Sequence, residues 1–249
     1  MTGSAVRSLD EQATDFATQI THTVAGVIDG ADPFVATVLD GGRRRQFTVR
    51  QSPETGIALP MSEGALVTLT ARFKGALDKQ GHYLRVETSA IKVYFGEAGG
   101  QPLFRYEYDG LRRSSIPRAH LQVGDQQDLA ALASLSGEAS RTARHRAGRI
   151  ESGMLPRSDH LHFPVGGDRF RPSLEDVLEM LVEQLGVPAL PDWRNSVAAG
   201  RRAWRTTQLR AAVRDHPQAA ADALAEAGYT VDPPPEGHPP PSEERLTLL

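Results

Sequence analysis

The sequence predicts an α+β fold in which a curved antiparallel sheet is packed by an amphipathic helix and followed by a helical C-terminal part. Two observations predict it. About six short runs of β-forming residues lie between residues 34 and 123, joined by glycine-containing turns. Apolar residues then recur at spacings of three and four over residues 174–185, which is typical of a helix with one buried face. We expect the sheet to be strongly curved or a partial barrel.

The N-terminal half supplies the expected sheet. An apolar stripe predicts a first helix over residues 9–28. Residues 51–64 contain two prolines and two glycines, so we expect a loop there. The expected strands are residues 34–39, 46–50, 65–73, 83–95, 103–109 and 120–123.

The stretch from residue 126 to 185 joins the sheet to its covering helix. We expect a short helix over 126–136 and a strand over 160–165 that rejoins the sheet. Residues 138–149 are polar and are interpreted as a solvated connector; on a helix, Arg141, His145 and Arg149 would form one basic ridge. In the helix 174–185, Ser173 followed by Asp176 resembles a capping pair, and Gly186 ends it. Its acidic residues fall on the side opposite the apolar stripe: Glu175, Asp176, Glu179 and Glu183.

The sequence of the C-terminal region predicts two helices, 192–214 and 217–227, followed by a proline-rich extended tail at 233–241. We expect residues 1–150 to form the N-terminal helix and β domain. Residues 151–230 should pack on it, and residues 231–249 should be a disordered tail.

Composition excludes several classes of function. A net charge of −3 disfavours a globally basic nucleic-acid binder. The absence of cysteine excludes disulfides, thiolate zinc sites and cysteine nucleophiles. No apolar run approaches the ~20 residues of a membrane span, and the first residues lack a signal-peptide core, so we expect a cytoplasmic protein without a membrane partner. The common phosphate-loop, dinucleotide, serine-hydrolase and zinc-protease motifs are missing, and we expect no cofactor.

The first candidate site is His160 and His162, two imidazoles on one face of the expected strand. Three interpretations stay open: structural hydrogen bonding, metal-free acid–base catalysis on RNA, and metal binding. Metal binding is the least favoured, because no nearby Asp/Glu/His cluster has ligand spacing.

The second candidate site uses the polar face of the most aromatic strand, which carries Arg105 and Glu107. If that strand pairs with residues 120–123, His120 and Gln122 join them on one sheet face. Metal-independent ribonucleases use such a set on a curved antiparallel sheet; the alternative is a solvated cross-strand charge pair.

Arginine-rich helices form a third candidate, for nucleic acid or an acidic partner. A solvated surface is the alternative reading. The residues concerned are Arg141, Arg144, Arg149, Arg201 and Arg205.

The segments LFRYEYD, AHLQV and HLHFPVGGDRFRPSLEDVLEMLVEQLGV resemble a family of uncharacterised proteins from high-GC, actinobacterial-type bacteria. That family implies no activity. Over Leu103–Val123 the chain also resembles the TumE-type toxins of toxin–antitoxin pairs, in which an aromatic–acidic strand precedes a histidine-bearing strand. It lacks their denser histidines, so no catalytic residue is carried over.

Three functions follow as hypotheses. The first is a non-enzymatic interaction or regulatory protein with an unknown protein partner, such as a neighbouring gene product. The second is a metal-independent endoribonuclease of toxin type, using His120, His160, His162, Arg105 and Glu107. The third is a nucleic-acid-binding protein. Whether the chain is an enzyme is left open by its sequence.

Overall fold

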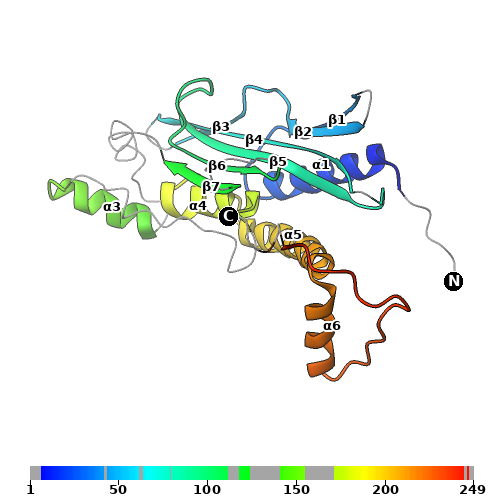
Figure 1. Ribbon diagram of the computed structural model, residues 1–249. Helices are drawn as coiled ribbons and strands as arrows, with labels where there is room; N and C mark the ends of the chain where they lie inside the picture. The colour runs from blue at the N-terminus through cyan, green and yellow to red at the C-terminus, as the bar shows by residue number, and fades with distance from the viewer. Residues whose placement is uncertain are drawn as a thin grey trace. The chain divides into compact units, whose positions relative to one another are not determined.

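The computed structural model describes residues 7–41, 44–61, 64–78, 80–111, 118–123, 141–154, 171–243 and 246, except the side chains of 141–143, 145 and 146. The chain forms two compact units, Met1–Arg201 and Arg202–Leu249, which are described separately. The α+β class is confirmed, because the described residues form one seven-stranded antiparallel sheet and five helices (Figure 1). The sheet is curved but open: its first and last strands lie at opposite edges and do not pair with each other to close a barrel.

All of the sheet lies in the first unit. Its order is β1-β2-β4-β5-β6-β7, and β3 pairs with β4 beside this path. The six strands expected between residues 34 and 123 are confirmed, with bounds that differ by up to four residues. Those bounds are β1 (Phe34–Asp40), β2 (Arg45–Gln51), β3 (Ile57–Pro60), β4 (Leu66–Leu77), β5 (Leu84–Phe95), β6 (Phe104–Asp109) and β7 (Ala119–Val123).

The expectation of a plain loop over residues 51–64 is wrong, because this stretch contains β3. β4 is long enough to pair with two strands along the same edge. β2 pairs with its residues 72–75 and β3 with its residues 66–69. Residues 51–64 contain two prolines and two glycines, and this composition predicts a loop although a short strand lies within it.

Gln51 bridges the point where β4 passes from one partner to the other. Its side chain is 4% exposed, and its Oε1 accepts the backbone N–H of Ala71 at 2.9 Å. That N–H would otherwise be a buried donor without a strand to pair with, which is costly. The side-chain amide of Gln51 therefore replaces one backbone hydrogen bond that a neighbouring strand would otherwise supply to β4.

We predict that Gln51→Met lowers the free energy of unfolding by about 1–3 kcal/mol, because the buried N–H of Ala71 loses its acceptor. Urea denaturation measures the change, and hydrogen exchange at the Ala71 amide should accelerate. Gln46→Met, at an exposed position of the same strand, is the control. Equal stability of the two variants would contradict this role for Gln51.

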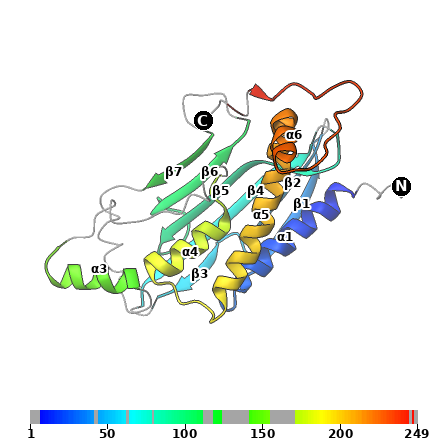
Figure 2. The same ribbon diagram turned by 90° about the horizontal axis from the view of Figure 1, so that it is seen from below.

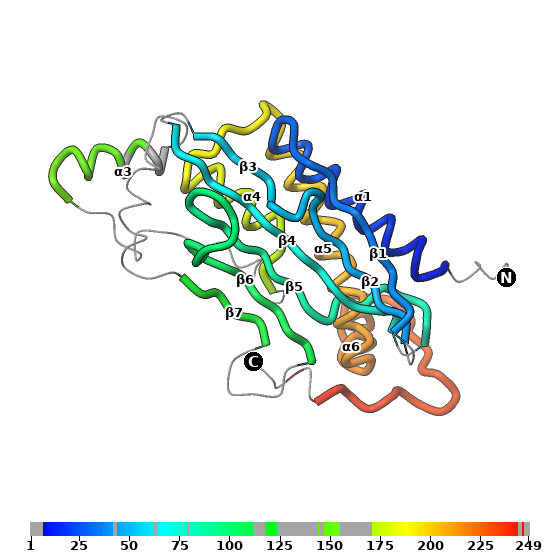
Figure 3. Tube along the Cα trace, turned by 90° about the horizontal axis from the view of Figure 1, so that it is seen from above, coloured from blue at the N-terminus to red at the C-terminus, as the bar shows by residue number. Residues whose placement is uncertain are grey.

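One face of the sheet is buried by helices (Figures 2 and 3). α1 (Leu9–Ala25) and α4 (Leu174–Leu185) both lie across it, and each begins with a capping box, Ser8 with Glu11 and Ser173 with Asp176. Gly186 ends α4 in the left-handed conformation at φ 75°. The apolar stripe predicted over 174–185 is therefore confirmed as part of the core. Its members there are Leu174, Val177, Leu178, Leu181, Val182 and Leu185.

The side of α4 opposite that stripe is not simply solvated. Glu175 is 6% exposed and Asp176 is 1% exposed. The start of α5 (Trp193–Asp215) packs here: a Cβ on Gly200 would come within 2.6 Å of the Glu175 carboxylate. The acidic residues predicted a polar side of α4, but the start of α5 covers this side at Glu175 and Asp176.

The two C-terminal helices were expected in outline, whereas a connector was expected before α4. α3 (Arg141–Glu151) overlaps the polar 138–149 stretch, which is therefore helical over most of its length rather than a plain connector. α5 and α6 (Pro217–Glu226) match the two C-terminal helices. In the second unit, the backbone N–H of Ser242 donates to the carbonyl of Asp215 at 2.8 Å. Residues 231–241 form neither helix nor strand, as their proline content predicts. The helix expected over 126–136 and the strand expected over 160–165 lie outside the described residues.

Candidate functional site

The face of the sheet opposite α1 and α4 carries polar side chains in register. Antiparallel pairing aligns residues directly across neighbouring strands, with their side chains on the same face. One row crosses five strands, and two shorter rows flank it. The long row is Arg50, Arg72, Ala90, Glu107 and His120; the flanking rows are Lys92, Arg105 and Gln122, and Lys74, Thr88 and Asp109.

The alternation of β6 explains why its charged residues reach this face. Phe104 and Tyr106 are 2% and 3% exposed, and their rings meet edge to face at 6.2 Å on the helix-covered side. Because successive strand residues point to opposite faces, Arg105 and Glu107 point away from the core. Burial of the aromatic pair thereby fixes the direction of the polar pair.

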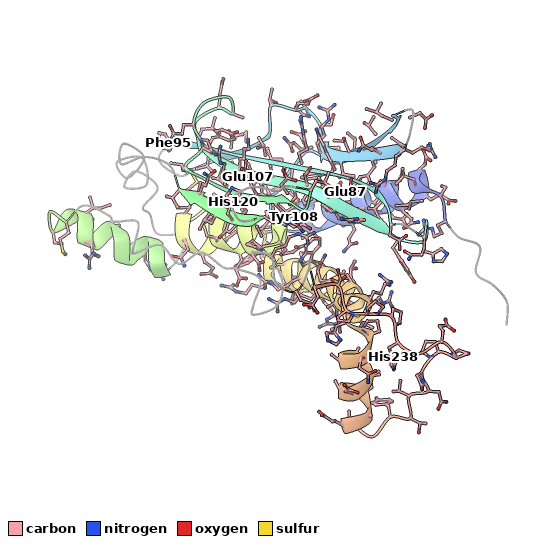
Figure 4. All side chains as sticks on the ribbon, viewed as in Figure 1. Glu87, Phe95, Glu107, Tyr108, His120 and His238 are labelled. Atoms are coloured by element: carbon pink, nitrogen blue, oxygen red, sulfur yellow. The ribbon has the colours of Figure 1, made fainter. Side chains whose placement is uncertain are left out.

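The carboxylate of Glu107 is the centre of the site (Figure 4). It lies 3.5 Å from His120 Nε2, 3.6 Å from Arg105 Nε and 3.9 Å from Lys92 Nζ. Arg105 Nε in turn donates to Gln122 Oε1 at 2.5 Å. His120 is only 12% exposed and Glu107 27%, so partial removal of water strengthens their interaction. The predicted convergence of His120, Glu107, Arg105 and Gln122 is confirmed as geometry.

A hollow of about 270 Å³ lies beside this cluster. The small side chain of Ala90 stands between Arg72 and Glu107 in the long row, and this leaves room for the hollow. Cations line one side and the His120–Glu107 pair lines the other. Its walls are Arg72, Lys74, Thr88, Ser89, Ala90, Glu107, Tyr108, Asp109 and His120.

The residue types around the hollow suit an anion and proton transfer. Arg72 and Lys74 line the hollow, and Lys92 and Arg105 lie in the neighbouring row beside Glu107. Ammonium and guanidinium groups such as these bind phosphate oxygens. A histidine held by a carboxylate can accept or donate a proton near neutral pH. Among the described residues, no group of three or more His, Asp or Glu side chains is arranged to hold a metal ion.

Sequence reasoning missed the cations of β4 and β5. Arg72, Lys74 and Lys92 each alternate with buried neighbours such as Phe73 and Ile91. That period-two pattern is visible in the sequence, but pairing partners are needed to place Lys92 beside Glu107, and Arg72 and Lys74 along the hollow. His160 and His162, the other predicted catalytic residues, lie outside the described residues.

The arginines predicted to bind nucleic acid differ in their surroundings. Arg144 on α3 is exposed and Arg149 is half-buried, while the side chain of Arg141 lies outside the described set. Arg205 is exposed in the second unit. Arg201 Nε pairs with Asp176 at 3.1 Å, and its guanidinium also binds Glu179. The charge of Arg201 is therefore used inside the fold, so a nucleic-acid role for it is no longer favoured.

A second group of polar side chains lies under the helices, against Asp176. Burial raises the pKa of Tyr106, and the negative charge of Asp176 raises it further. Burial also raises the pKa of Glu175 above its ordinary value. The guanidinium of Arg171 stacks on the ring of Tyr108 at 4.1 Å, and its burial lowers its pKa. Glu175 and Asp176 contact the start of α5, at Gly200 and Arg201, and do not line the hollow; Tyr108 lines the hollow and also stacks against Arg171.

Glu175 makes stability depend on pH. Because its pKa is raised in the folded state, Glu175 stays protonated there at pH values at which it has already lost its proton in the unfolded chain. The free energy of unfolding therefore falls as the pH rises from the unfolded-state pKa to the folded-state pKa. We predict that Glu175→Gln stabilises the protein by about 0.5–2 kcal/mol at pH 7. The gain should shrink below the unfolded pKa of about 4.3, where both states are protonated.

Thermal unfolding at pH 7 and pH 4 measures this gain. Glu183→Gln is the control, since Glu183 pairs with Arg194 at the surface. A loss of stability in Glu175→Gln at pH 7 would mean that the ionised carboxylate is needed by its neighbours.

Comparisons with protein-family models, with curated proteins and with solved structures give no match to this chain. The resemblances stated from the sequence therefore stay predictions. In the part of the chain that the structure describes, no helix combines the length and apolar character needed to cross a bilayer.

Proposed function

We propose that the chain is a metal-independent endoribonuclease whose site is the polar sheet face around His120 and Glu107. The observation that carries the proposal is the triple contact of the Glu107 carboxylate with His120, Arg105 and Lys92, within 3.9 Å. A ribonuclease of this type needs a proton acceptor and cations for the phosphate, both held rigidly. Glu107, Arg105 and Lys92 lie on β6 and β5 inside the sheet, and His120 lies on the edge strand β7, which is paired with β6. Placement on paired strands rather than on loops provides that rigidity.

The proposed reaction is internal transfer within RNA. The 2′-oxygen forms a bond to the adjacent phosphorus, and the bond from phosphorus to the 5′-oxygen breaks. Neutral His120 takes the proton of the 2′-hydroxyl, and Glu107 stabilises the imidazolium that forms. Arg105 and Lys92 balance the charge that develops on the phosphoryl oxygens. The leaving 5′-oxygen gains a proton, so the products are a 2′,3′-cyclic phosphate and a 5′-hydroxyl.

The second proton transfer is the role expected of His160 or His162. Both lie outside the described residues, so their contribution stays a prediction from the sequence. The reaction as proposed rests on His120, Glu107 and the two cations.

The non-enzymatic interaction or regulatory protein, expected first from the sequence, remains the competing hypothesis. A cross-strand charge pair worth a few tenths of a kcal/mol accounts for the Glu107–His120 contact alone. It does not account for a hollow with Arg72 and Lys74 on its opposite side. The sequence-based expectation of a bacterial, cytoplasmic protein is part of the nuclease proposal, and the neighbouring gene product as partner is part of the non-enzymatic hypothesis.

We predict that the purified chain cleaves single-stranded RNA in the presence of EDTA and leaves cyclic phosphate ends. His120→Ala should lower the rate by about 10²–10⁴-fold, because proton transfer is lost, and Glu107→Gln by about tenfold or more. His160→Ala tests the second transfer. Gel electrophoresis of end-labelled RNA measures all four proteins.

His82→Ala is the matched control, since His82 is an exposed histidine in the turn before β5. It should cleave at the wild-type rate. Binding of RNA without cleavage by the wild-type protein would favour the non-enzymatic hypothesis, and equal cleavage by wild type and His120→Ala would point to a contaminating nuclease.

A further inference from the structure

A second anion-binding position lies on the same sheet face, at the other end of the long row. Arg50 on β2 and Arg72 on β4 are directly paired across the two strands. Both guanidinium groups bind one carboxylate, that of Glu54, which follows β2 in the loop before β3. The Arg72 Nη2 to Glu54 Oε2 distance is 3.2 Å. We call Arg50, Arg72 and Glu54 the arginine clamp.

The arginine clamp already holds a planar anion between two guanidinium groups. Two arginines converging on one oxyanion is also the arrangement that binds a phosphodiester. Glu54 is 60% exposed and Arg72 is 49% exposed, so the ion pairs face solvent. Exposed pairs are weak, which means that a competing anion can displace the carboxylate at little cost.

The clamp is too far from Glu107 to hold the phosphate that reacts there. Ala90 separates Arg72 from Glu107 in the row, so their backbones are two strand spacings apart, roughly 9–10 Å. Arg72 turns toward Glu54 on the β2 side. An anion in the clamp must therefore be a different group of the same ligand, which requires a ligand with more than one phosphate.

We propose that Glu54 occupies a phosphate subsite of the protein, and that single-stranded RNA displaces it. In this proposal one phosphate lies at His120 and Glu107 while a neighbouring phosphate of the same strand replaces Glu54 between Arg50 and Arg72. Lys74 lies two residues from Arg72 on the same exposed side of β4 and lines the hollow between the two positions. Glu54 thus competes with the substrate. The inference rests on the proposed function, since it takes RNA as the ligand.

Glu54→Gln separates this proposal from simple charge attraction. It removes the competing anion, so affinity for a 12-nucleotide single-stranded RNA should rise by about two- to fivefold. The slope of log affinity against log salt should stay close to that of wild type, because the phosphate contacts Arg50 and Arg72 in both proteins. Arg72→Gln should weaken binding and make the slope shallower by about 0.7, the value for one lost phosphate contact on a single strand.

The control must change net charge equally without touching the clamp. Asp40→Asn does so, because Asp40 is exposed and shares Arg45 with Asp10 of α1. Its affinity for RNA should equal that of wild type. A dinucleotide with a single phosphate is the second control, since it cannot occupy both positions at once and should gain less affinity from Glu54→Gln than the 12-mer gains.

Fluorescence anisotropy at several salt concentrations, on the full chain at a temperature where cleavage is slow, measures these affinities. Equal affinity of Glu54→Gln and Asp40→Asn for the 12-mer overturns the subsite, even if RNA is cleaved. A gain with the 12-mer but no cleavage supports the subsite and rejects the nuclease. A gain seen instead with an acidic peptide, and no RNA binding, rejects both.

Discussion

Burial of one face of the sheet by α1 and α4 is the constraint on which the rest of the structure depends. The apolar side chains of α4 and of alternate residues in β4 and β5 share one core. Six large aliphatic side chains of α4 gain about 1.5–3 kcal/mol each on burial, an upper bound before entropy is counted. The strands therefore point most of their large apolar residues to that side, with Val35 and Leu39 of the edge strand β1 as exposed exceptions. The charged residues of the same strands are left on the other side by the pleat alone.

Strand register then decides which charged residues meet. A shift of one residue would send a strand's charged residues to the core, so the register of β5 against its neighbours is fixed by burial. A bulge between Lys74 and Gly75 adjusts β4 against β5 just below the hollow. Gly75 is required there, because a Cβ would lie 1.9 Å from the carbonyl oxygen of Arg85. Lys74 and Thr88 are the last pair before this shift, so they keep the register of Arg72 and Ala90, and Thr88 in turn pairs with Asp109.

The resulting face combines two kinds of polar position. At one end a partly desolvated histidine contacts a carboxylate, and that carboxylate is also within reach of two cations. At the other end two arginines share one exposed carboxylate. The hollow between them is floored by Ala90, the smallest side chain in the row. A ligand that carries several negative charges along its length fits such a face better than a compact anion does.

The local spacing of apolar and polar residues was enough to predict most helices and strands and the part of the site on β6 and β7. Period-two alternation in LFRYEYD gave the direction of Arg105 and Glu107, and the capping pair at Ser173 gave the start of α4. β3 was missed because its signal is four residues long and lies among prolines. The burial of Glu175 and the contribution of Arg72 were missed because both depend on partners distant in sequence. The chain divides after Arg201, inside α5, where no change in composition marks a boundary.

The most direct test of the division between a buried and a functional face uses single cysteines, since the chain has none of its own. Thr88→Cys lies at the hollow, and Val93→Cys replaces a side chain that is 0% exposed on the helix side of the same strand. Native-state labelling should be fast at position 88 and slowed by single-stranded RNA. At position 93 it should require unfolding. Comparable labelling at both positions, or no protection of position 88 by RNA, would contradict the assignment of function to this face.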